Sequence, residues 1–177
     1  VHLCGEPLRI DGMTRIQAPA SQAITVDSGG LSRAFDVTGA SAKVLLDGLI
    51  VTGGSGPRGG GIRASSAESL IVANCLITGN AADEWGGGIF VEYTPLLLAN
   101  CDVSGNFADG TGGGLMVAPD GDFMAVNCVF SENSATSNGG AIAVANSEAF
   151  LMRCEVTDNS ALAADSRGGG IFLPGSS

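Results

Sequence analysis

Cysteine is the residue type in this chain whose spacing first suggests chemistry. Cys75, Cys101, Cys128 and Cys154 are separated by 26, 27 and 26 residues. If these cysteines stack in parallel strands, their Cβ atoms lie about 4.8 Å apart, whereas a disulfide needs about 3.8 Å. The Cys-x2-Cys spacing of zinc sites is absent as well. We therefore interpret the four as small apolar core residues, and Cys4 as the thiol that could react or pair with another chain.

Two aspartates, Asp83 and Asp109, occupy equivalent positions, each three residues after a repeated asparagine. Stacked one coil apart, their carboxylates would lie about 5 Å from each other and would repel unless solvated or bridged by a cation. Glu84 adds a third charge beside them. The pair is therefore a candidate Ca²⁺ site, as is the loop with Asp120 and Asp122; solvated loop acids are the alternative, and no other cofactor is predicted.

The elements that position these residues follow from a repeat. Asparagines recur with the spacing of the cysteines, and a glycine cluster followed by an aliphatic residue recurs in each unit. The asparagines are Asn80, Asn106, Asn133 and Asn159, and the glycine clusters begin at Gly59, Gly86, Gly112, Gly139 and Gly168. Three markers in one register indicate a stack of short repeated units.

Alternation within each unit is typical of strands. The residues two before and two after each cysteine are apolar, as Ala73 and Ile77 are around Cys75, while the residue before it is polar. No helical periodicity appears, and the units are too short for a strand with a packed helix. The sequence therefore predicts an all-β fold, a single-stranded right-handed parallel β-helix of about 6 coils of 26–27 residues.

The predicted β-helix is one domain that spans residues 1–177. We expect residues 1–40 to form irregular opening coils or an N-terminal cap, and residues 41–177 to form the regular coils. Because the last glycine cluster is followed by only a few residues, we expect the chain to be a fragment of a longer protein. The first strands are predicted at Leu8–Ile10, Ile24–Val26, Phe35–Val37 and Val44–Val51.

The repeated asparagines are expected to serve the fold. An asparagine can adopt the left-handed backbone conformation of a turn, and its amide can hydrogen-bond the asparagine of the next coil. We therefore predict that Asn80, Asn106, Asn133 and Asn159 form a buried or half-buried ladder at one corner of the coils.

A line of residues follows the glycine clusters on the outward side of the strand. The line consists of Arg63, Phe90, Met116, Ala143 and Phe172. An apolar stripe beside glycines is typical of a partner or ligand surface, and coverage by a loop or a neighbouring domain is the alternative. Trp85, one residue before its glycine cluster, is a candidate for stacking on a sugar ring.

Charge and hydropathy exclude two classes of partner. The formal net charge is −10 and the eight basic residues are scattered, so no basic cluster could neutralise phosphates, and nucleic-acid binding is not predicted. No run of 18 or more apolar residues is present, so no membrane-spanning segment is predicted.

Two motifs carry a resemblance to a known family. Residues 130–133 (FSEN) and 139–142 (GGAI) resemble the FxxN and GGA[ILV] repeats of chlamydial polymorphic outer membrane proteins. Degenerate versions of the first motif stand at Ile77–Asn80, Val103–Asn106 and Val156–Asn159. More widely, residues 40–177 resemble bacterial right-handed β-helix repeat proteins of the pectin-lyase-like class, and Leu8–Gly12 resembles the first coil of that class. The resemblance implies a secreted or surface-exposed passenger, and for the polymorphic proteins it implies adhesion.

Enzymes are also found in the pectin-lyase-like class, so catalysis must be considered. A lyase needs clustered carboxylates for Ca²⁺ and a basic residue that takes the proton, and a glycosidase needs paired carboxylates. The one histidine, His2, lies in the opening segment, and Arg63 and Arg153 lie on different faces. We therefore predict no catalytic residue, although another portion of the chain could supply a site.

These observations favour an extracellular or bacterial cell-surface β-helix that acts in adhesion, display or filament-forming assembly. The expected partners are further copies of the chain, another surface protein or a glycan, because the open ends of a solenoid expose strand edges. The alternative is a β-helix that binds or degrades polysaccharides.

Overall fold

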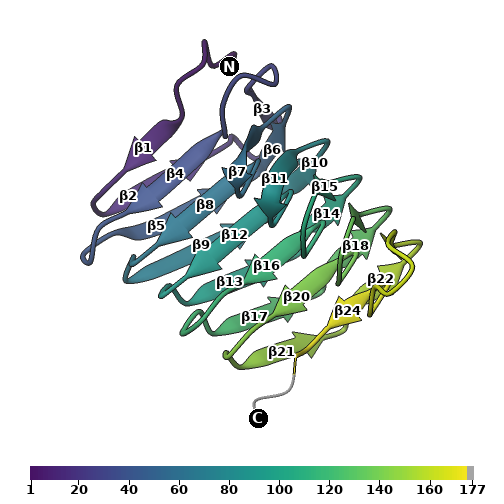
Figure 1. Cartoon of the computed structure of the whole chain (residues 1–177). Coiled ribbons are helices and arrows are strands. Elements are labelled where there is room, and N and C mark those ends of the chain that lie inside the picture. Colours follow the sequence, from purple (N-terminus) through teal and green to yellow (C-terminus); the bar gives the residue numbers. More distant parts are fainter. Residues whose placement is uncertain (175–177) are drawn as a thin grey trace.

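The computed structural model describes residues 1–174, which form a single stack of β-coils (Figure 1). All named elements are strands; no helix is present in these residues, and so none is long and apolar enough to cross a membrane. Each regular coil contributes one strand to each of four parallel sheets, which we call sheets 1 to 4 in the order in which a coil passes through them. The all-β solenoid of about six coils predicted from the repeat is therefore confirmed.

The bounds of the strands are short and regular. Sheet 1 contains β1 (Leu8–Ile10), β4 (Phe35–Thr38), β8 (Ile62–Ser65), β12 (Ile89–Glu92), β16 (Leu115–Val117), β20 (Ile142–Val144) and β24 (Ile171–Phe172). Sheet 2 contains β2 (Thr14–Gln17), β5 (Lys43–Asp47), β9 (Ser69–Ala73), β13 (Leu96–Ala99), β17 (Phe123–Val126) and β21 (Ala149–Met152). Sheet 3 contains β3 (Ile24–Asp27), β6 (Leu49–Thr52), β10 (Leu76–Thr78), β14 (Asp102–Ser104), β18 (Val129–Ser131) and β22 (Glu155–Thr157). Sheet 4 contains β7 (Ser55–Arg58), β11 (Ala81–Trp85), β15 (Phe107–Ala108), β19 (Ser134–Ala135) and β23 (Ser160–Ala161).

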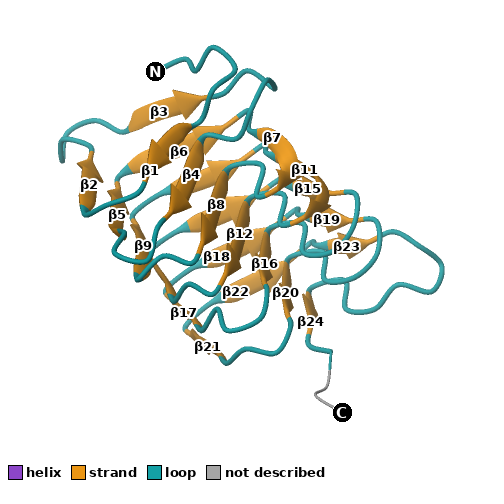
Figure 2. Cartoon of the chain, turned by 60° about the vertical axis from the view of Figure 1, so that its left-hand side comes forward, coloured by secondary structure: helices purple, strands orange, loops and turns teal. Residues whose placement is uncertain are grey.

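The core is the column enclosed by the four sheets (Figure 2). Inward positions alternate along each strand, as in β9, where Leu70 and Val72 are fully buried and Ile71 between them is exposed. The residues in register on the next coil, Leu96 and Leu98, continue the same column. Each coil therefore packs its apolar side chains on those of its two neighbours, and the whole core is built from contacts between adjacent coils.

The first coil is more regular than its sequence indicated. Strand β1 pairs with β4, β2 with β5 and β3 with β6, so the opening residues already lie in the frame of the later coils. The strand at Thr14–Gln17 was not predicted, because its alternation spans only four residues. The strand predicted at Val44–Val51 is divided into β5 and β6 at Gly48, whose φ of 71° turns the chain from sheet 2 to sheet 3.

The glycine clusters bring neighbouring coils into close contact. A Cβ on Gly87 would lie 2.2 Å from the carbonyl oxygen of Phe107 in the following coil. Gly86 has a φ of 65°, and a Cβ there would lie 2.2 Å from the carbonyl oxygen of Ile89. Side chains are excluded at both positions by backbone. Gly87 therefore makes room for the next coil, and Gly86 for the turn within its own coil.

Candidate functional site

The repeated asparagines form a hydrogen-bonded ladder inside the corner between sheets 3 and 4. The Nδ2 of Asn80 donates to Oδ1 of Asn106, the Nδ2 of Asn106 to Oδ1 of Asn133, and the Nδ2 of Asn133 to Oδ1 of Asn159, each at 3.0 Å. The Oδ1 of each later asparagine also accepts the backbone N–H of the preceding one, as Asn106 does from Asn80 at 3.1 Å, and Asn80 Oδ1 accepts the N–H of Gly54 at 2.9 Å. The first three side chains are buried, and Asn159 is partly buried at the last coil. Every polar atom of the ladder is engaged by the fold, which leaves none for a ligand.

The left-handed residue at this corner is not the ladder asparagine, as the sequence had suggested. It is the residue just before it: Gly79, Gly105, Glu132 and Asp158 have φ between 55° and 64°. Asn74, Asn100 and Asn127, which precede the cysteines, adopt φ of 51° to 53° and form a second, exposed ladder. The outer ladder is joined by side-chain bonds of 3.2 Å and ends on Asp47, which accepts from Asn74 at 2.8 Å.

The repeated cysteines lie in the wall of the core, and all five cysteines are free thiols. Cys75, Cys101 and Cys128 are buried, Cys154 is partly buried, and Cys4 is exposed. Burial raises the pKa of the Cys75 thiol, and the contact with the Cys128 thiol, together with burial, raises the pKa of Cys101. The Cys75 and Cys101 thiols therefore stay neutral at physiological pH and behave as small apolar groups, whereas Cys4 is open to solvent.

The candidate calcium ligands Asp83 and Asp109 lie on the outside of sheet 4. The pairing of Ala82 with Ala108 places them at equivalent positions in adjacent coils, and both are exposed. The Oδ1 of Asp109 accepts a hydrogen bond from Thr136 Oγ1 at 2.9 Å, and Glu84 bonds Arg58. Within residues 1–174 no group of three or more histidine, cysteine or acidic side chains converges on one point. Two carboxylates supply only a small part of the roughly six to eight oxygens that Ca²⁺ takes, so calcium binding here stays a prediction.

The loop acids Asp120 and Asp122 lie at the turn between sheets 1 and 2, together with Asn146, Ser147 and Glu148 of the next coil. Asp122 Oδ1 accepts the backbone N–H of Glu148 at 3.4 Å, and Asp120 has a φ of 56°. These contacts shape the turn, and they do not orient the carboxylates toward a common centre.

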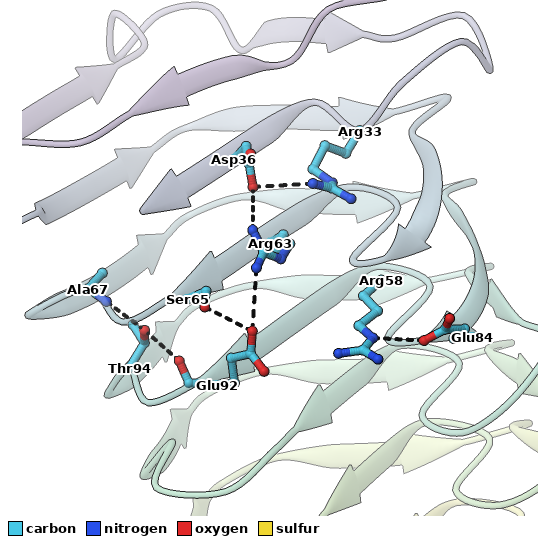
Figure 3. Close-up of polar contacts among 9 residues, drawn as sticks. All are labelled: Arg33, Asp36, Arg58, Arg63, Ser65, Ala67, Glu84, Glu92 and Thr94. Carbon is cyan, nitrogen blue, oxygen red and sulfur yellow. Dashed lines mark hydrogen bonds and ion pairs between the residues drawn. The ribbon is translucent and has the colours of Figure 1, made fainter. Parts of the chain in front are cut away.

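A ladder of ion pairs crosses the outward side of sheet 1 in its first coils (Figure 3). Asp36 Oδ1 lies 3.2 Å from Arg33 Nη1 and 3.1 Å from Arg63 Nη1, and Arg63 Nη2 lies 3.4 Å from Glu92 Oε1. Ser65 donates to the same Glu92 oxygen at 2.8 Å. All four charged side chains are at least three-quarters buried. Arg63 is therefore held by two carboxylates and is not a free base for proton abstraction.

The apolar line predicted as an interaction surface is covered over most of its length. Phe90 is 0% exposed, Ala143 1% and Met116 9%, while Phe172 is partly buried against them. The Trp85 ring stacks on Phe90 with centroids 6.2 Å apart, and the Arg58 guanidinium lies 4.3 Å from the Trp85 centroid. The expectation of an exposed stripe was therefore wrong, because these side chains pack on one another in a second apolar cluster that also includes Trp85, Ala118 and Ala145. The same guanidinium lies 5.8 Å from the Phe90 centroid, so it lies over both rings, and stacking of Trp85 on a sugar ring stays a prediction.

The exposed apolar surface lies instead on sheet 2. Its central row, which we call the sheet 2 row, consists of Leu45, Ile71, Leu97, Met124 and Phe150, paired in register from β5 to β21. Exposure is lowest at partly buried Leu45 and Leu97 and greatest at the far end of the row, where it reaches 41% for Met124 and 53% for Phe150. Four residues of the row, from Ile71 to Phe150, line a shallow groove of about 400 Å³ together with Pro95, Asp122 and Glu148. This groove is the candidate functional site.

A family model for the right-handed β-helix region matches residues 21–177. The chain belongs to the right-handed β-helix family. The match covers the regular coils and, of the first coil, the strand β3, in agreement with the register of β3 on β6. No curated protein and no solved structure matches the chain.

In this right-handed β-helix the sheet 2 row could have been found from the sequence. The strands of sheet 2 lack the usual alternation: Leu70–Val72, Leu96–Leu98 and Phe123–Ala125 are apolar at three successive positions. A strand that is apolar on both sides either packs against a core on each side or leaves one apolar side exposed. The signal was missed because the glycine clusters pointed to sheet 1.

Proposed function

We propose that this β-helix is an extracellular or cell-surface element that acts in adhesion, display or assembly, and that the outward face of sheet 2 is its interaction surface. The observation that carries the proposal is the sheet 2 row, a continuous line of five apolar side chains that stay accessible on an otherwise acidic molecule. Exposed apolar patches of this kind mark interaction sites in soluble proteins.

Two further observations support the proposal. The asparagines and glycines that give the repeat its signature are engaged in coil stacking, so they do not form a reaction centre. The repeats also resemble those of chlamydial polymorphic outer membrane proteins in residues 130–133 and 139–142, a resemblance that favours a surface passenger.

The test measures adhesion and polysaccharide cleavage with the same preparation. The chain is coupled to fluorescent microspheres, which are passed over glass coated with the chain itself, with polygalacturonate, with alginate or with nothing. We expect retention on the chain-coated glass and about a tenfold loss of it in an Ile71→Ser/Met124→Ser/Phe150→Ser variant, because the apolar contact area is removed. Phe107→Ser, which replaces a 37% exposed phenylalanine on sheet 4, is the matched control and should not change retention.

Cleavage is followed by the absorbance of unsaturated sugar products and by new reducing ends. Release of such products from polygalacturonate or alginate would replace this proposal by the polysaccharide-degrading alternative. Retention on a polysaccharide without cleavage would support a glycan-binding module, and equal retention of the wild type and the serine variant would show that sheet 2 is not the surface.

A further inference from the structure

We propose that the sheet 2 face binds the same face of a second copy of this chain, in a two-fold dimer whose coil axes run antiparallel. The inference rests on the proposed function only in its choice of surface, since it names the partner of that surface. In this arrangement Leu97 lies near its own counterpart, Ile71 faces Met124, and Leu45 faces Phe150.

The sheet 2 face suits an apolar partner surface better than it suits a polar ligand. Beside the sheet 2 row runs a second outward row, Ala73, Ala99, Val126 and Met152, which continues the line from Asp47 by register. Met152 is 55% exposed and the other three are partly buried. After Asp47 neither of these two rows holds a hydrogen-bonding side chain, so the groups that could orient a glycan or an extended peptide are confined to the flanking column of Lys43, where Ser69, Asp122 and Glu148 line the groove. A flat aliphatic face is matched best by another flat aliphatic face.

The charges at the four corners of the face identify the partner as a second copy. Lys43 begins β5 and Asp47 ends it, while Glu148 precedes β21 and Arg153 follows it. Register places Glu148 in the column of Lys43, and Arg153 adjoins Met152, which occupies the column of Asp47. One flank therefore runs from a positive charge at Lys43 to a negative charge at Glu148. The other flank runs from a negative charge at Asp47 to a positive charge at Arg153. A pattern of this kind is complementary to itself under a two-fold axis lying in the face.

Within the monomer these corner charges are only partly used. Lys43 Nζ lies 2.8 Å from Glu68 Oε1, and both side chains remain about half exposed (49% and 50%). Asp47 accepts hydrogen bonds from Gln17 and Asn74, each at 2.8 Å. Glu148 and Arg153 are exposed. All four corners can therefore meet a partner's charge without breaking a buried interaction.

The direction of the dimer follows from the ends of the row. In a parallel dimer each residue of the row meets its own counterpart, whereas antiparallel copies set Phe150 of one against Leu45 of the other. Arg15, exposed and in register before Leu45, would face Arg15 of the second copy in the parallel dimer. Like charges directly opposed are unfavourable, so the antiparallel arrangement is preferred.

The size of the face sets the expected affinity. Five coils spaced by about 4.8 Å and strands of about four residues give a flat footprint on the order of 300 Å². This area is small beside the roughly 800 Å² per partner of a standard interface. We therefore expect reversible dimerisation with a Kd of about 10–100 µM, in a range where crowding on a surface would drive it.

Sedimentation equilibrium of the chain over a concentration series tests the inference. We expect the average mass to rise from monomer to dimer, and we expect Ile71→Ser/Met124→Ser/Phe150→Ser to remain a monomer at every concentration. Phe107→Ser should dimerise like the wild type. Circular dichroism and the thermal midpoint of each variant show that it is folded, since these side chains lie on the outside of the coils.

Charge swaps test the direction. Glu148→Lys should weaken the dimer by about fivefold to tenfold, because it faces Lys43 of the partner in the antiparallel arrangement. Lys43→Glu/Glu148→Lys should restore the wild-type Kd within about twofold. In a parallel dimer the same double swap would set the carboxylate introduced at position 43 against Asp47 of the second copy and would weaken association further, and that result would overturn the antiparallel arrangement.

Other outcomes separate this inference from the proposed function. A chain that stays monomeric at all concentrations, yet whose microspheres adhere to another surface through sheet 2, overturns the dimer and leaves the adhesive function standing. A dimer unaffected by the serine substitutions overturns the choice of face. Dimerisation through sheet 2 together with polysaccharide cleavage overturns the proposed function and leaves the dimer.

Discussion

Sheets 1 and 2 both place large apolar side chains on their outward side, but only sheet 2 leaves them exposed. On sheet 1, Phe90 is fully buried beneath Trp85, and Met116 is 9% exposed. On sheet 2, Met124 and Phe150 are 41% and 53% exposed. The strand geometry is the same in both sheets, and the difference comes from the turns beside them.

The comparison distinguishes the direction in which a side chain points from the extent to which it is buried. Alternation determines whether a side chain points into the coil or away from it. Whether an outward side chain is buried depends on the connection that follows, and here the segment around Trp85 closes over one face while the tight turn at Asn74 or Asn100 passes beside the other. The covered face is a second core, and the open face is available for binding.

The largest effect is expected when one phenylalanine on each face is replaced by alanine. Phe90→Ala should lower the free energy of unfolding by about 3–5 kcal/mol, because it removes a fully buried ring from a packed cluster. Phe150→Ala should change it by about 0.5 kcal/mol or less, as surface substitutions do. Urea denaturation at low protein concentration measures both. Similar losses for the two variants would show that the faces do not differ.

Removal of the Trp85 ring should expose the outward side of sheet 1, as that of sheet 2 is exposed already. Trp85→Ala should destabilise the fold by about 2 kcal/mol, less than full burial would give, because Trp85 is itself only partly buried. It should also increase the binding of a hydrophobic dye, since Phe90 becomes accessible. The same dye measured on Trp85→Phe, which keeps a ring over Phe90, should stay near the wild-type level.

The buried thiols inside the coils can be compared with the side chains on both outward faces. Burial raises the pKa of Cys75 in the folded chain, so the unfolded thiol ionises first as the pH increases. The stabilisation from this thiol is therefore complete below the ordinary thiol pKa of 9.0 and is lost above it, by about 1.4 kcal/mol per pH unit. Urea midpoints between neutral pH and about pH 10.5 measure the loss. A Cys75→Val variant should show a flatter profile; an unchanged slope would assign the loss to other groups.

Among the contacts of the covered face, the smallest expected effect concerns the guanidinium of Arg58. Arg58→Met should cost about 0.5–1 kcal/mol, because the guanidinium lies 4.3 Å from the Trp85 centroid and also bonds Glu84. Glu84→Gln removes the charge pair and keeps the guanidinium over the ring, so it should cost less. Thermal unfolding of the two variants separates the contributions, and a larger loss for Glu84→Gln would assign the stability to the ion pair.

The repeat and its inward residues could be predicted from spacing alone, because stacking fixes the same position in every coil. The row of Cys75, Ile77 and their equivalents lies in the core as the alternation indicated. The cover over Phe90 could not be predicted in this way, because it depends on how the side chains of Trp85 and Arg58, the last residues of β11 and β7, lie over sheet 1. Local spacing carries no information on where such side chains pack. The left-handed role of Gly79 instead of Asn80 was missed for the same reason.

Register has a consequence for how this molecule could change in length. Each coil bonds only to the coils beside it, and Ile71, Leu97 and Met124 hold one column across 26- and 27-residue steps. Duplication of a gene segment that encodes one coil would therefore add one rung to the asparagine ladder, one strand to each sheet and one apolar residue to the sheet 2 row. Recombination in whole units would therefore change the length of the sheet 2 face without a new type of side chain.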